Sequence, residues 1–436
     1  MSAQANKDYV PFTKDMIATH TILVPTMLPM HFKMIISYME TFGYHLELLE
    51  TNGPQIPETG LKYVHNDACY PAILVIGQLM DAVNSGKYDK DKIALIYFQT
   101  GGGCRASNYM SLIRKALKRA GCENIPVISF SFAGIEKHPG FKVTPAMLYG
   151  MLYGVLYGDL LMTLVNQVRP YEVEKGAAQR LADEWTTRLG RELGQGHIRY
   201  QKVKENYRRI IDGFAGIPVE KRDAVKVGVV GEIFVKYSPL GNNNLEQFLV
   251  DEGAEVVVPG LLDFLLYCVY NSVLDYELYG RNYWTHVGAK IAFKFLCRKK
   301  NDMIEILQED GRFQAPTPFE HTTTLAKGIL GIGAKMGEGW LLTSEMLELI
   351  ESGCKNIVCT QPFGCLPNHI CGKGMMKPIK ERHPDVNIVA IDYDASSPRV
   401  NQENRLKLML SNARANLAAE REAERKAAET DPVPVK

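Results

Sequence analysis

The sequence has almost no net charge. Lysine and arginine number 50 and aspartate and glutamate 49 among 436 residues, so the formal charge is +1, and the two signs are mixed along the chain. Proteins that bind nucleic acid or an anionic membrane surface usually carry an excess of basic charge, so this balance argues against both classes of partner. We therefore expect neither nucleic acid nor a membrane among its partners.

Long apolar runs and a signal peptide are lacking as well. No uninterrupted apolar run reaches the ~18 residues of a spanning helix. The first residues, MSAQANKDYVPFTK, lack the apolar core of a secretory signal, so we expect a cytoplasmic protein. Thiols stay reduced in that compartment, and the nine cysteines are expected to be core residues, redox groups or metal ligands.

Strand and helix patterns alternate in two parts of the chain. In the first part, the strand KIALIYFQT, a glycine-rich turn, the helix YMSLIRKALKRAG and the strand IPVISFSF follow one another. A second series runs from VKVGVVGEIFV to VNIVAIDYD. This alternation predicts an α/β fold with parallel sheets covered by helices. The expected parts are a first domain at 1–140, a helical subdomain at 141–222, a second domain at 223–400, and a C-terminal helix with a disordered tail at 401–436.

Three cysteines are expected at the carboxyl ends of strands. Cys69 follows the short predicted strand LKYV, Cys104 follows KIALIYFQT, and Cys365 follows NIVCTQ. Ligands bind at this edge of an open α/β sheet, where the next helix begins with free N–H groups. A thiolate there is stabilised, so we expect its pKa to fall, as a metal ligand requires. Two domains would then bring three thiolates to one cleft.

The cysteine spacing favours an iron–sulfur cluster over zinc. Zinc sites commonly use paired C-x2–4-C ligands, and no suitable pair occurs here. Clusters accept scattered thiolates and keep one iron open when three cysteines bind. Cys371 lies six residues after Cys365, and its roles as a fourth ligand or as a lining of the helix start both stay open. The other cysteines are expected to be buried: Cys268 and Cys297 in the core, Cys122 and Cys354 beside strands.

Several segments resemble one protein family. They are FTKDMIATHTILVPTMLPMHF, YVHNDACYPAILVIGQL, QTGGGCRASNYMSLIRKAL, GEGWLLTSEM, QPFGCLPNHICGKGMMKPIK and DYDASSPRVNQENRLKLML. They are similar to the 2-hydroxyacyl-CoA dehydratase and benzoyl-CoA reductase superfamily, and more narrowly to the module at the carboxyl end of the very large acyl-CoA dehydratase activase proteins. The resemblance covers nearly the whole chain and implies two Rossmann-like domains with a helical part.

The same resemblance implies a cofactor and partners. The cofactor is an oxygen-sensitive 4Fe-4S cluster between the domains, held by Cys69, Cys104 and Cys365. The partners are a second subunit, either a copy of this chain or a related one, and an activase ATPase of the actin and sugar-kinase (ASKHA) fold. This activase carries its own 4Fe-4S cluster and delivers electrons at low potential. A relative holds a double-cubane iron–sulfur cluster with more cysteines, and Cys359 and Cys371 keep that alternative open.

One glycine-rich stretch does not make this chain an ATPase. The segment GILGIGAKMGEG (Gly328–Gly339) lacks the spacing of a phosphate-binding loop, and no strand precedes it. A packing or loop role is expected, and the electrons would come from the separate ATPase.

Polar residues beside the cysteines are candidates for proton transfer and for holding the cluster. The candidate catalytic residues are His65, Asp67 and His369, with helix capping by His369 and turn closure by Asn66 and Asp67 as the structural alternatives. The candidate cofactor-binding residues are Asn66, Gly102, Gly103, Arg105 and Asn368. A solvated structural role is expected for Glu338, Asp392 and Asp394.

Three functions fit these residues. We favour a catalytic iron–sulfur subunit of an ATP-dependent system that reduces an unsaturated or 2-hydroxyacyl-CoA-like substrate, or small molecules if the cluster is a double cubane. The second is an electron relay or scaffold, for which Cys371 would complete a closed cluster that binds no substrate. The third is an α/β binding protein with zinc or no metal.

Overall fold

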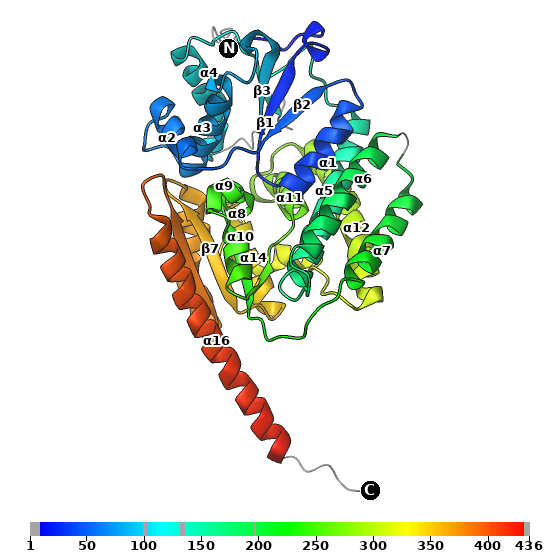
Figure 1. Cartoon of the computed structure of the whole chain (residues 1–436), viewed down its shortest axis with the longest axis vertical. Coiled ribbons are helices and arrows are strands. Elements are labelled where there is room, and N and C mark those ends of the chain that lie inside the picture. The colour runs from blue at the N-terminus through cyan, green and yellow to red at the C-terminus, as the bar shows by residue number, and fades with distance from the viewer. Residues whose placement is uncertain (1–8, 99–102, 131–135, 196–197, 431–436) are drawn as a thin grey trace.

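The computed structural model describes residues 9–98, 103–130, 136–195 and 198–430. Its strands form two four-stranded sheets that are parallel throughout, with helices packed on them (Figure 1). The α/β fold with two parallel sheets, expected from the alternation of strands and helices, is confirmed.

The first sheet lies in the N-terminal part of the chain and has the strand order β2-β1-β3-β4. Its strands are β1 (Thr21–Pro25), β2 (His45–Leu49), β3 (Ile93–Phe98) and β4 (Val127–Phe130). The helices of this lobe are α1 (Pro29–Glu40), α2 (Gln55–Tyr63), α3 (Tyr70–Asn84) and α4 (Tyr109–Arg119).

The strand expected just before Cys69 is wrong, because LKYV belongs to α2 and the turn after it. Ile56 and Gly60 are buried on one face of α2, with the spacing of a helix. This face lies so close to α3 that a side-chain carbon on Gly60 would stand 2.1 Å from the carbonyl oxygen of Ile73. Cys69 therefore lies between two tightly packed helices.

Three helices fill the region expected to be helical: α5 (Pro145–Val168), α6 (Ala177–Gly194) and α7 (Tyr200–Ala215). By length and composition α5 could cross a membrane, but 78% of its most apolar window is buried inside the protein. Asp159 interrupts the apolar run of α5, so no uninterrupted apolar run of spanning length marks this helix in the sequence. Burial in the protein accounts for its apolar composition.

The second sheet has the order β6-β5-β7-β8. Its strands are β5 (Lys226–Gly231), β6 (Glu255–Val257), β7 (Asn356–Pro362) and β8 (Asn387–Tyr393). Its helices are α8 (Ile233–Tyr237), α9 (Pro239–Asn242), α10 (Leu245–Asp251), α11 (Leu261–Tyr279), α12 (Tyr283–Asp310), α13 (Phe319–Leu325), α14 (Trp340–Glu351), α15 (Met376–Arg382) and α16 (Arg399–Thr430). The helix α16 extends away from the body (Figure 1), and the disordered tail expected after it falls outside the described residues.

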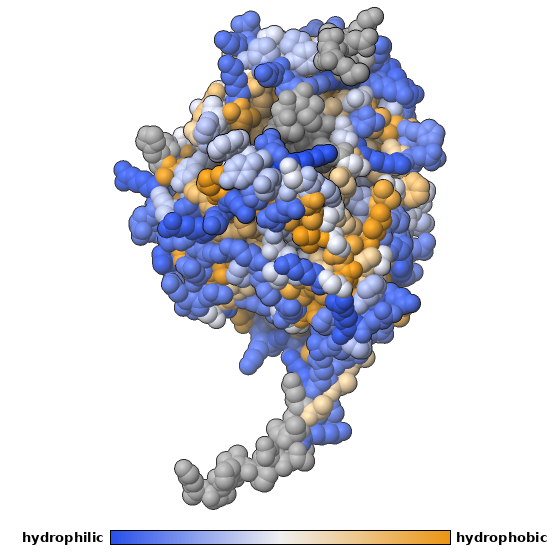
Figure 2. All heavy atoms as spheres, turned by 180° about the vertical axis from the view of Figure 1, so that it is seen from behind, coloured by the Kyte–Doolittle hydropathy of each residue, from blue (hydrophilic) through white to orange (hydrophobic). Residues whose placement is uncertain are grey.

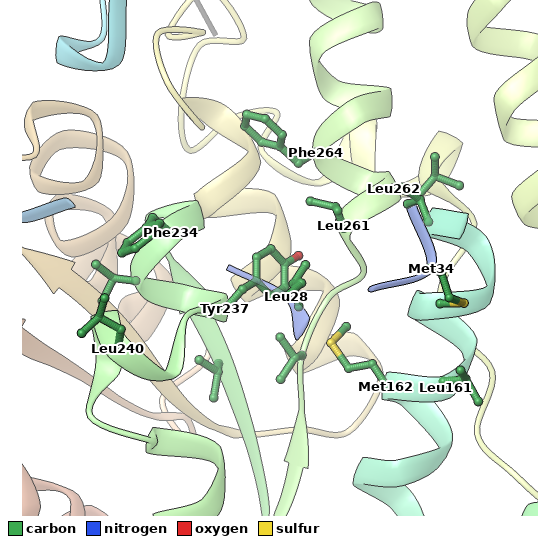
Figure 3. Packing of buried hydrophobic residues seen from close by; sticks show 14 of the residues in the cluster. Leu28, Met34, Leu161, Met162, Phe234, Tyr237, Leu240, Leu261, Leu262 and Phe264 are labelled. Carbon is green, nitrogen blue, oxygen red and sulfur yellow. The ribbon is translucent and has the colours of Figure 1, made fainter. Parts of the chain in front are cut away.

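One hydrophobic core joins the two lobes. It contains Leu23 and Leu95 from the first sheet together with Val227 and Val358 from the second. Figure 3 shows side chains of the first lobe, of α5 and of the second lobe packed together, among them Leu28, Met34, Leu161, Met162, Phe234, Tyr237, Leu240, Leu261, Leu262 and Phe264. A shared core of this kind fixes the position of each sheet edge relative to the other.

Buried Asp159 on α5 ties three parts of this core together. Its carboxylate accepts the N–H groups of Leu261 and Leu262 at 2.7 and 3.0 Å, at the start of α11, and lies 2.9 Å from Nε2 of His31 on α1. An anion is favoured at a helix start, where the first N–H groups lack partners in the helix.

Replacing this carboxylate should destabilise the whole chain. Asp159→Ala leaves the N–H groups of α11 and the His31 ring without their buried acceptor, so the free energy of unfolding should fall by about 2–4 kcal/mol. Urea unfolding followed by circular dichroism measures this loss. The exposed Asp183→Ala on α6 is the control and should stay within about 0.5 kcal/mol of wild type. Equal stability of the two variants would contradict the bridging role.

Candidate metal centre

Each of the three candidate ligands stands at the start of a helical turn. Cys69 precedes α3, Cys104 precedes the 3₁₀ turn Arg105–Asn108, and Cys365 precedes a turn that begins at Leu366. Each sulfur accepts a backbone N–H from that turn, donated by Ala72, Ala106 and Asn368 respectively. Cys104 follows β3 and Cys365 follows β7, so these two lie after strands as expected. All three cysteines lie at the start of a helical turn, as was also expected.

The three turns lie against one another across the two lobes. The Tyr70 N–H donates to the carbonyl of Phe363 at 3.0 Å, so the Cys69 turn is bonded to the Cys365 turn. A side-chain carbon on Gly337 would lie 3.8 Å from Cys104 Sγ and 2.9 Å from Pro367 Cγ. The turns that carry Cys69, Cys104 and Cys365 are thus in contact where the two lobes meet, and this junction of the three turns is called the crevice below.

Burial raises the pKa of all three thiols. The pKa of Cys104 rises to about 12, first through burial and then through Glu338, Glu232 and Cys69. The pKa of Cys365 rises through burial, Glu338, Glu232 and Cys104, and that of Cys69 through burial and Glu232. The expected fall in thiol pKa is therefore wrong for the metal-free protein, because desolvation and like charges outweigh one N–H bond per sulfur.

Two carboxyl groups face the same crevice and were missed as site residues. Glu232 follows β5 and caps α8, where its side chain accepts the Val235 N–H at 2.9 Å. Glu338 is buried in the loop before α14 and accepts the Ile233 N–H at 3.0 Å. Burial, and then the charge of Glu338, raise the pKa of Glu232 to about 8.

The solvated role expected for Glu338 is wrong, because its side chain is buried beside Cys104 and Cys365. Its loop confirms the expected loop role of Gly328–Gly339, with Gly337 and Gly339 at positive φ. The sequence could have identified Glu232, because it directly follows a strand, and the position after a strand is what made Cys104 a candidate. The exposed Asp392 binds Lys373 at 3.0 Å and Arg405 at 3.2 Å, a solvated structural role as expected.

Residues 65–67 form an exposed turn before Cys69. The Asp67 N–H donates to His65 Nδ1 at 3.2 Å, and the two side chains pair at 3.3 Å, so they close the turn. Asn66 is exposed as well. Arg105 donates to the carbonyl oxygen of Asp67 and so joins the Cys104 turn to the Cys69 turn. These contacts give Asp67 and Arg105 a part in holding the crevice together.

Asn368 fixes the Cys365 turn to the second sheet. This fully buried side chain donates from Nδ2 to the carbonyl of Thr360 at 2.8 Å and accepts from the Cys359 thiol at 3.5 Å. Cys359 thus lies in β7 with its thiol turned to Asn368. His369 is exposed, and its Nδ1 lies 2.7 Å from the Cys365 carbonyl oxygen, within its own turn.

The remaining predicted residues are two glycines and two cysteines, and they do not all lie where they were expected. Gly103 donates its N–H to Met336 Sδ at 3.1 Å, which joins the Cys104 turn to the Glu338 loop, whereas Gly102 falls outside the described residues. Cys371 is buried in a π-helical turn, and burial and Glu338 raise its pKa to about 11. Cys268 is exposed, so its expected core position is wrong, because it lies on the outward side of α11.

The candidate donors are three thiols that come from separate turns. Among the described residues, no three His, Cys, Asp or Glu side chains are grouped closely enough to hold one metal ion. A cluster of several irons is a wider body and accepts thiolates that stand farther apart. The carboxylates of Glu338 and Glu232 raise the pKa of Cys104 and of Cys365, and positively charged iron bonded to the sulfurs would lower these pKa values.

Large apolar side chains are exposed in the segments that hold Cys365 and Glu338. Met336, Phe363, Leu366 and Ile370 are large apolar residues that remain exposed, and all belong to the Cys365 turns or to the Glu338 loop. On the face seen in Figure 2, apolar patches lie across the middle of the body among hydrophilic residues. An exposed apolar rim beside a polar crevice is typical of a binding surface.

Comparisons with known proteins add no assignment. A scan against protein-family models and a search of curated proteins both find no match for this chain.

The carboxyl group of Glu232 should make the stability of the metal-free protein depend on pH. Its folded-state pKa lies above its unfolded value, so the folded state holds a proton that the unfolded state has lost between about pH 5 and 8. Stability should therefore fall as pH rises through this window, and Glu232→Gln should remove roughly 1 kcal/mol or more of that fall.

Urea unfolding at pH 5 and pH 8 measures this difference. The exposed Glu174→Gln is the matched control and should keep the wild-type pH dependence. If both variants show the same fall, the carboxyl of Glu232 is not held in its protonated form.

Proposed function

We propose that this chain is the iron–sulfur protein of an ATP-dependent reductase or dehydratase system, with a 4Fe-4S cluster bound by Cys69, Cys104 and Cys365. The observation that carries the proposal is the convergence of three helix-start thiols, one from each of three turns, in a crevice between two parallel-sheet lobes. The resemblance to the 2-hydroxyacyl-CoA dehydratase superfamily supports the same assignment.

The substrate class follows from the chemistry that the crevice offers. When bound, a three-cysteine cluster supplies a low-potential electron and an iron without a protein ligand. This suits reduction of an unsaturated or 2-hydroxyacyl-CoA-like substrate. The protonated carboxyl of Glu232 can give a proton to the reacting group, because a pKa of about 8 keeps it neutral at pH 7.

Other residues would hold this site in place. Asn368 fixes the Cys365 turn to β7, and Glu338 holds the start of α8 through the Ile233 N–H. Lys236 is buried 2.9 Å from Glu345, and its positive charge lowers the pKa of Glu232 and of Glu338 against the larger effect of burial. The apolar rim would exclude water once a partner or substrate covers it.

Electrons would come from a separate ATPase of the ASKHA fold with its own 4Fe-4S cluster. The glycine-rich loop Gly328–Gly339, which holds the buried Glu338, lacks the spacing of a phosphate-binding loop. A chain of this kind therefore needs an external donor to reach low potential.

Two alternatives remain. A double-cubane cluster needs additional thiols at the crevice. The thiol of Cys359, which lies in β7, donates a hydrogen bond to the side chain of Asn368. A closed cluster that only relays electrons needs Cys371 as a fourth ligand, and Cys371 shares Glu338 as a neighbour with the crevice thiols.

Iron binding should depend on three cysteines. The wild-type chain, purified without oxygen, should contain iron and sulfide and show a cluster EPR signal on reduction. Cys69→Ser, Cys104→Ser and Cys365→Ser should each lose most of the iron, whereas Cys122→Ser should keep it, because each cluster ligand is a thiolate.

Cys371→Ser separates the alternatives. Retained iron favours the catalytic cluster with an open iron, and lost iron favours the relay. Twice the expected iron per chain would indicate a double cubane, and no iron in the wild type would contradict the proposal. Conversion of a 2-hydroxyacyl-CoA, or reduction of acetylene or hydrazine, with ATP and a cognate ATPase then tests turnover.

We also propose that a second copy of this chain covers an apolar surface at the turn between α11 and α12. Trp284 is 79% exposed there, and the other large exposed apolar residues of this surface are Leu278, Tyr279, Tyr283, Ile291 and Phe295. Gly280, at φ 65°, ends α11 and allows the turn. The surface reaches the Glu338 loop, because a side-chain carbon on Gly333 would lie 3.3 Å from the Tyr279 hydroxyl.

The apolar character of this surface favours a permanent subunit over the ATPase. Interfaces of obligate dimers are rich in aromatic and aliphatic side chains, whereas electron-transfer contacts are small and transient. A surface of one tryptophan, two tyrosines and three other large apolar residues belongs to the first class.

A charge at the centre of this surface should break the dimer. Wild type should be a dimer by light scattering at micromolar concentration, and Trp284→Glu should be a monomer, because the interface would bury an unpaired carboxylate. Val173→Glu, at an exposed apolar residue outside the surface, should remain dimeric. A monomeric wild type, or a dimeric Trp284→Glu, would contradict a second copy as the occupant.

A further inference from the structure

A tyrosine hydroxyl touches one of the three candidate ligands. Tyr109 is the first residue of α4, and its Oη lies 2.9 Å from Cys69 Sγ. Both side chains are buried, with relative exposures of 3% and 6%. They belong to one small apolar cluster with Ala72, separate from the main core. The contact is therefore shielded from competing water.

This hydrogen bond makes Cys69 different from the other two cysteines. Cys69 Sγ has two donors within reach, the Tyr109 hydroxyl and the Ala72 N–H, whereas Cys104 and Cys365 each receive one backbone N–H among the described residues. A sulfur that binds a metal has lost its proton, so the hydroxyl must then be the donor.

The ring of Tyr109 is held in this position by a neighbour. Tyr97 on β3 packs against it with ring centroids 5.1 Å apart and planes inclined by 37°. Among the described residues, the Tyr97 hydroxyl makes no recorded hydrogen bond to a cysteine sulfur. The two tyrosines thus share one packing contact, Tyr97 being partly buried and Tyr109 buried, and they differ in the bond to sulfur.

We propose that Tyr109 is a positioning residue that sets the reduction potential of the cluster through its hydrogen bond to Cys69. The inference rests on the proposed function, because it assigns Cys69 as a cluster ligand. A hydrogen bond to a ligand sulfur draws negative charge from it and stabilises the reduced state, which carries one more electron. Tyr109 should therefore make the cluster easier to reduce.

Removal of the hydroxyl should shift the potential in one direction. In Tyr109→Phe the ring remains and the hydrogen bond is lost, so the equilibrium constant for reduction by a fixed donor should fall on the order of tenfold. Tyr97→Phe removes a hydroxyl from the adjacent ring and should leave the potential unchanged. Redox titration of the full-length, cluster-loaded protein, followed by EPR, measures both.

A second substitution tests the opposite direction. A fluorotyrosine at position 109 has a more acidic hydroxyl and donates a stronger hydrogen bond, so the midpoint potential should move upward. Opposite shifts from these two substitutions would support the assignment, since a general loosening of the fold would not produce them.

The outcomes separate this inference from the proposed function. Wild-type protein without iron overturns the proposed function and this inference with it. Suppose that the wild type holds a cluster. If Tyr109→Phe then has the wild-type potential, or if Tyr97→Phe shifts the potential as much as Tyr109→Phe does, only the role of Tyr109 is overturned. The role of Tyr109 in setting the potential is also overturned if Tyr109→Phe loses its iron and the fluorotyrosine protein keeps the wild-type potential. The hydroxyl would then serve only to keep the cluster bound.

Discussion

Burial of ionisable side chains where the two lobes meet is the constraint on which the site depends. Three thiols and two carboxyl groups converge where the lobes meet, and burial raises the pKa of each of them; the charge of a neighbouring carboxylate adds to the rise for the three thiols and for Glu232. A fold gains no stability from such an arrangement in the absence of a cation. The arrangement is understandable if the groups are kept for a positively charged occupant, and soft thiolate ligands suit the iron–sulfur cluster that we propose.

The rest of the molecule holds this unfavourable arrangement together. The two sheets share one hydrophobic core, and Asp159 joins α1, α5 and α11 at its centre. Closer to the crevice, bonds from Tyr70 to Phe363 and from Gly103 to Met336 link turns of different lobes. This rigid frame fixes the turns of the two lobes relative to one another and so defines a common ligand position.

Sequence alone located much of the fold and the three cysteines. The alternation of strands and helices was sufficient for two parallel sheets, because period-2 and period-3.6 patterns are local properties. The helix-start position of Cys104 and Cys365 followed from their place after strands. The strand before Cys69 was wrong because α2 is a short helix packed through Gly60, and such close packing depends on a distant partner, α3.

The two carboxyls and the Tyr109 bond show what sequence patterns leave undetermined. Glu338 lies in a loop whose neighbours come from α8 and from the Cys104 turn, so its burial depends on tertiary contacts. The same holds for Cys268, whose apolar helix leaves one side open to solvent. Contacts between residues far apart in the chain decide which polar groups meet, and one sequence does not contain that information.

The most direct test of the central claim is a crystal structure of the oxygen-free protein with anomalous scattering measured at the iron edge. The account predicts iron density in the crevice between the two sheets, bonded to the sulfurs of Cys69, Cys104 and Cys365. Iron bound elsewhere on the chain, or an iron-free crevice in protein that remains folded and reduced, would contradict it.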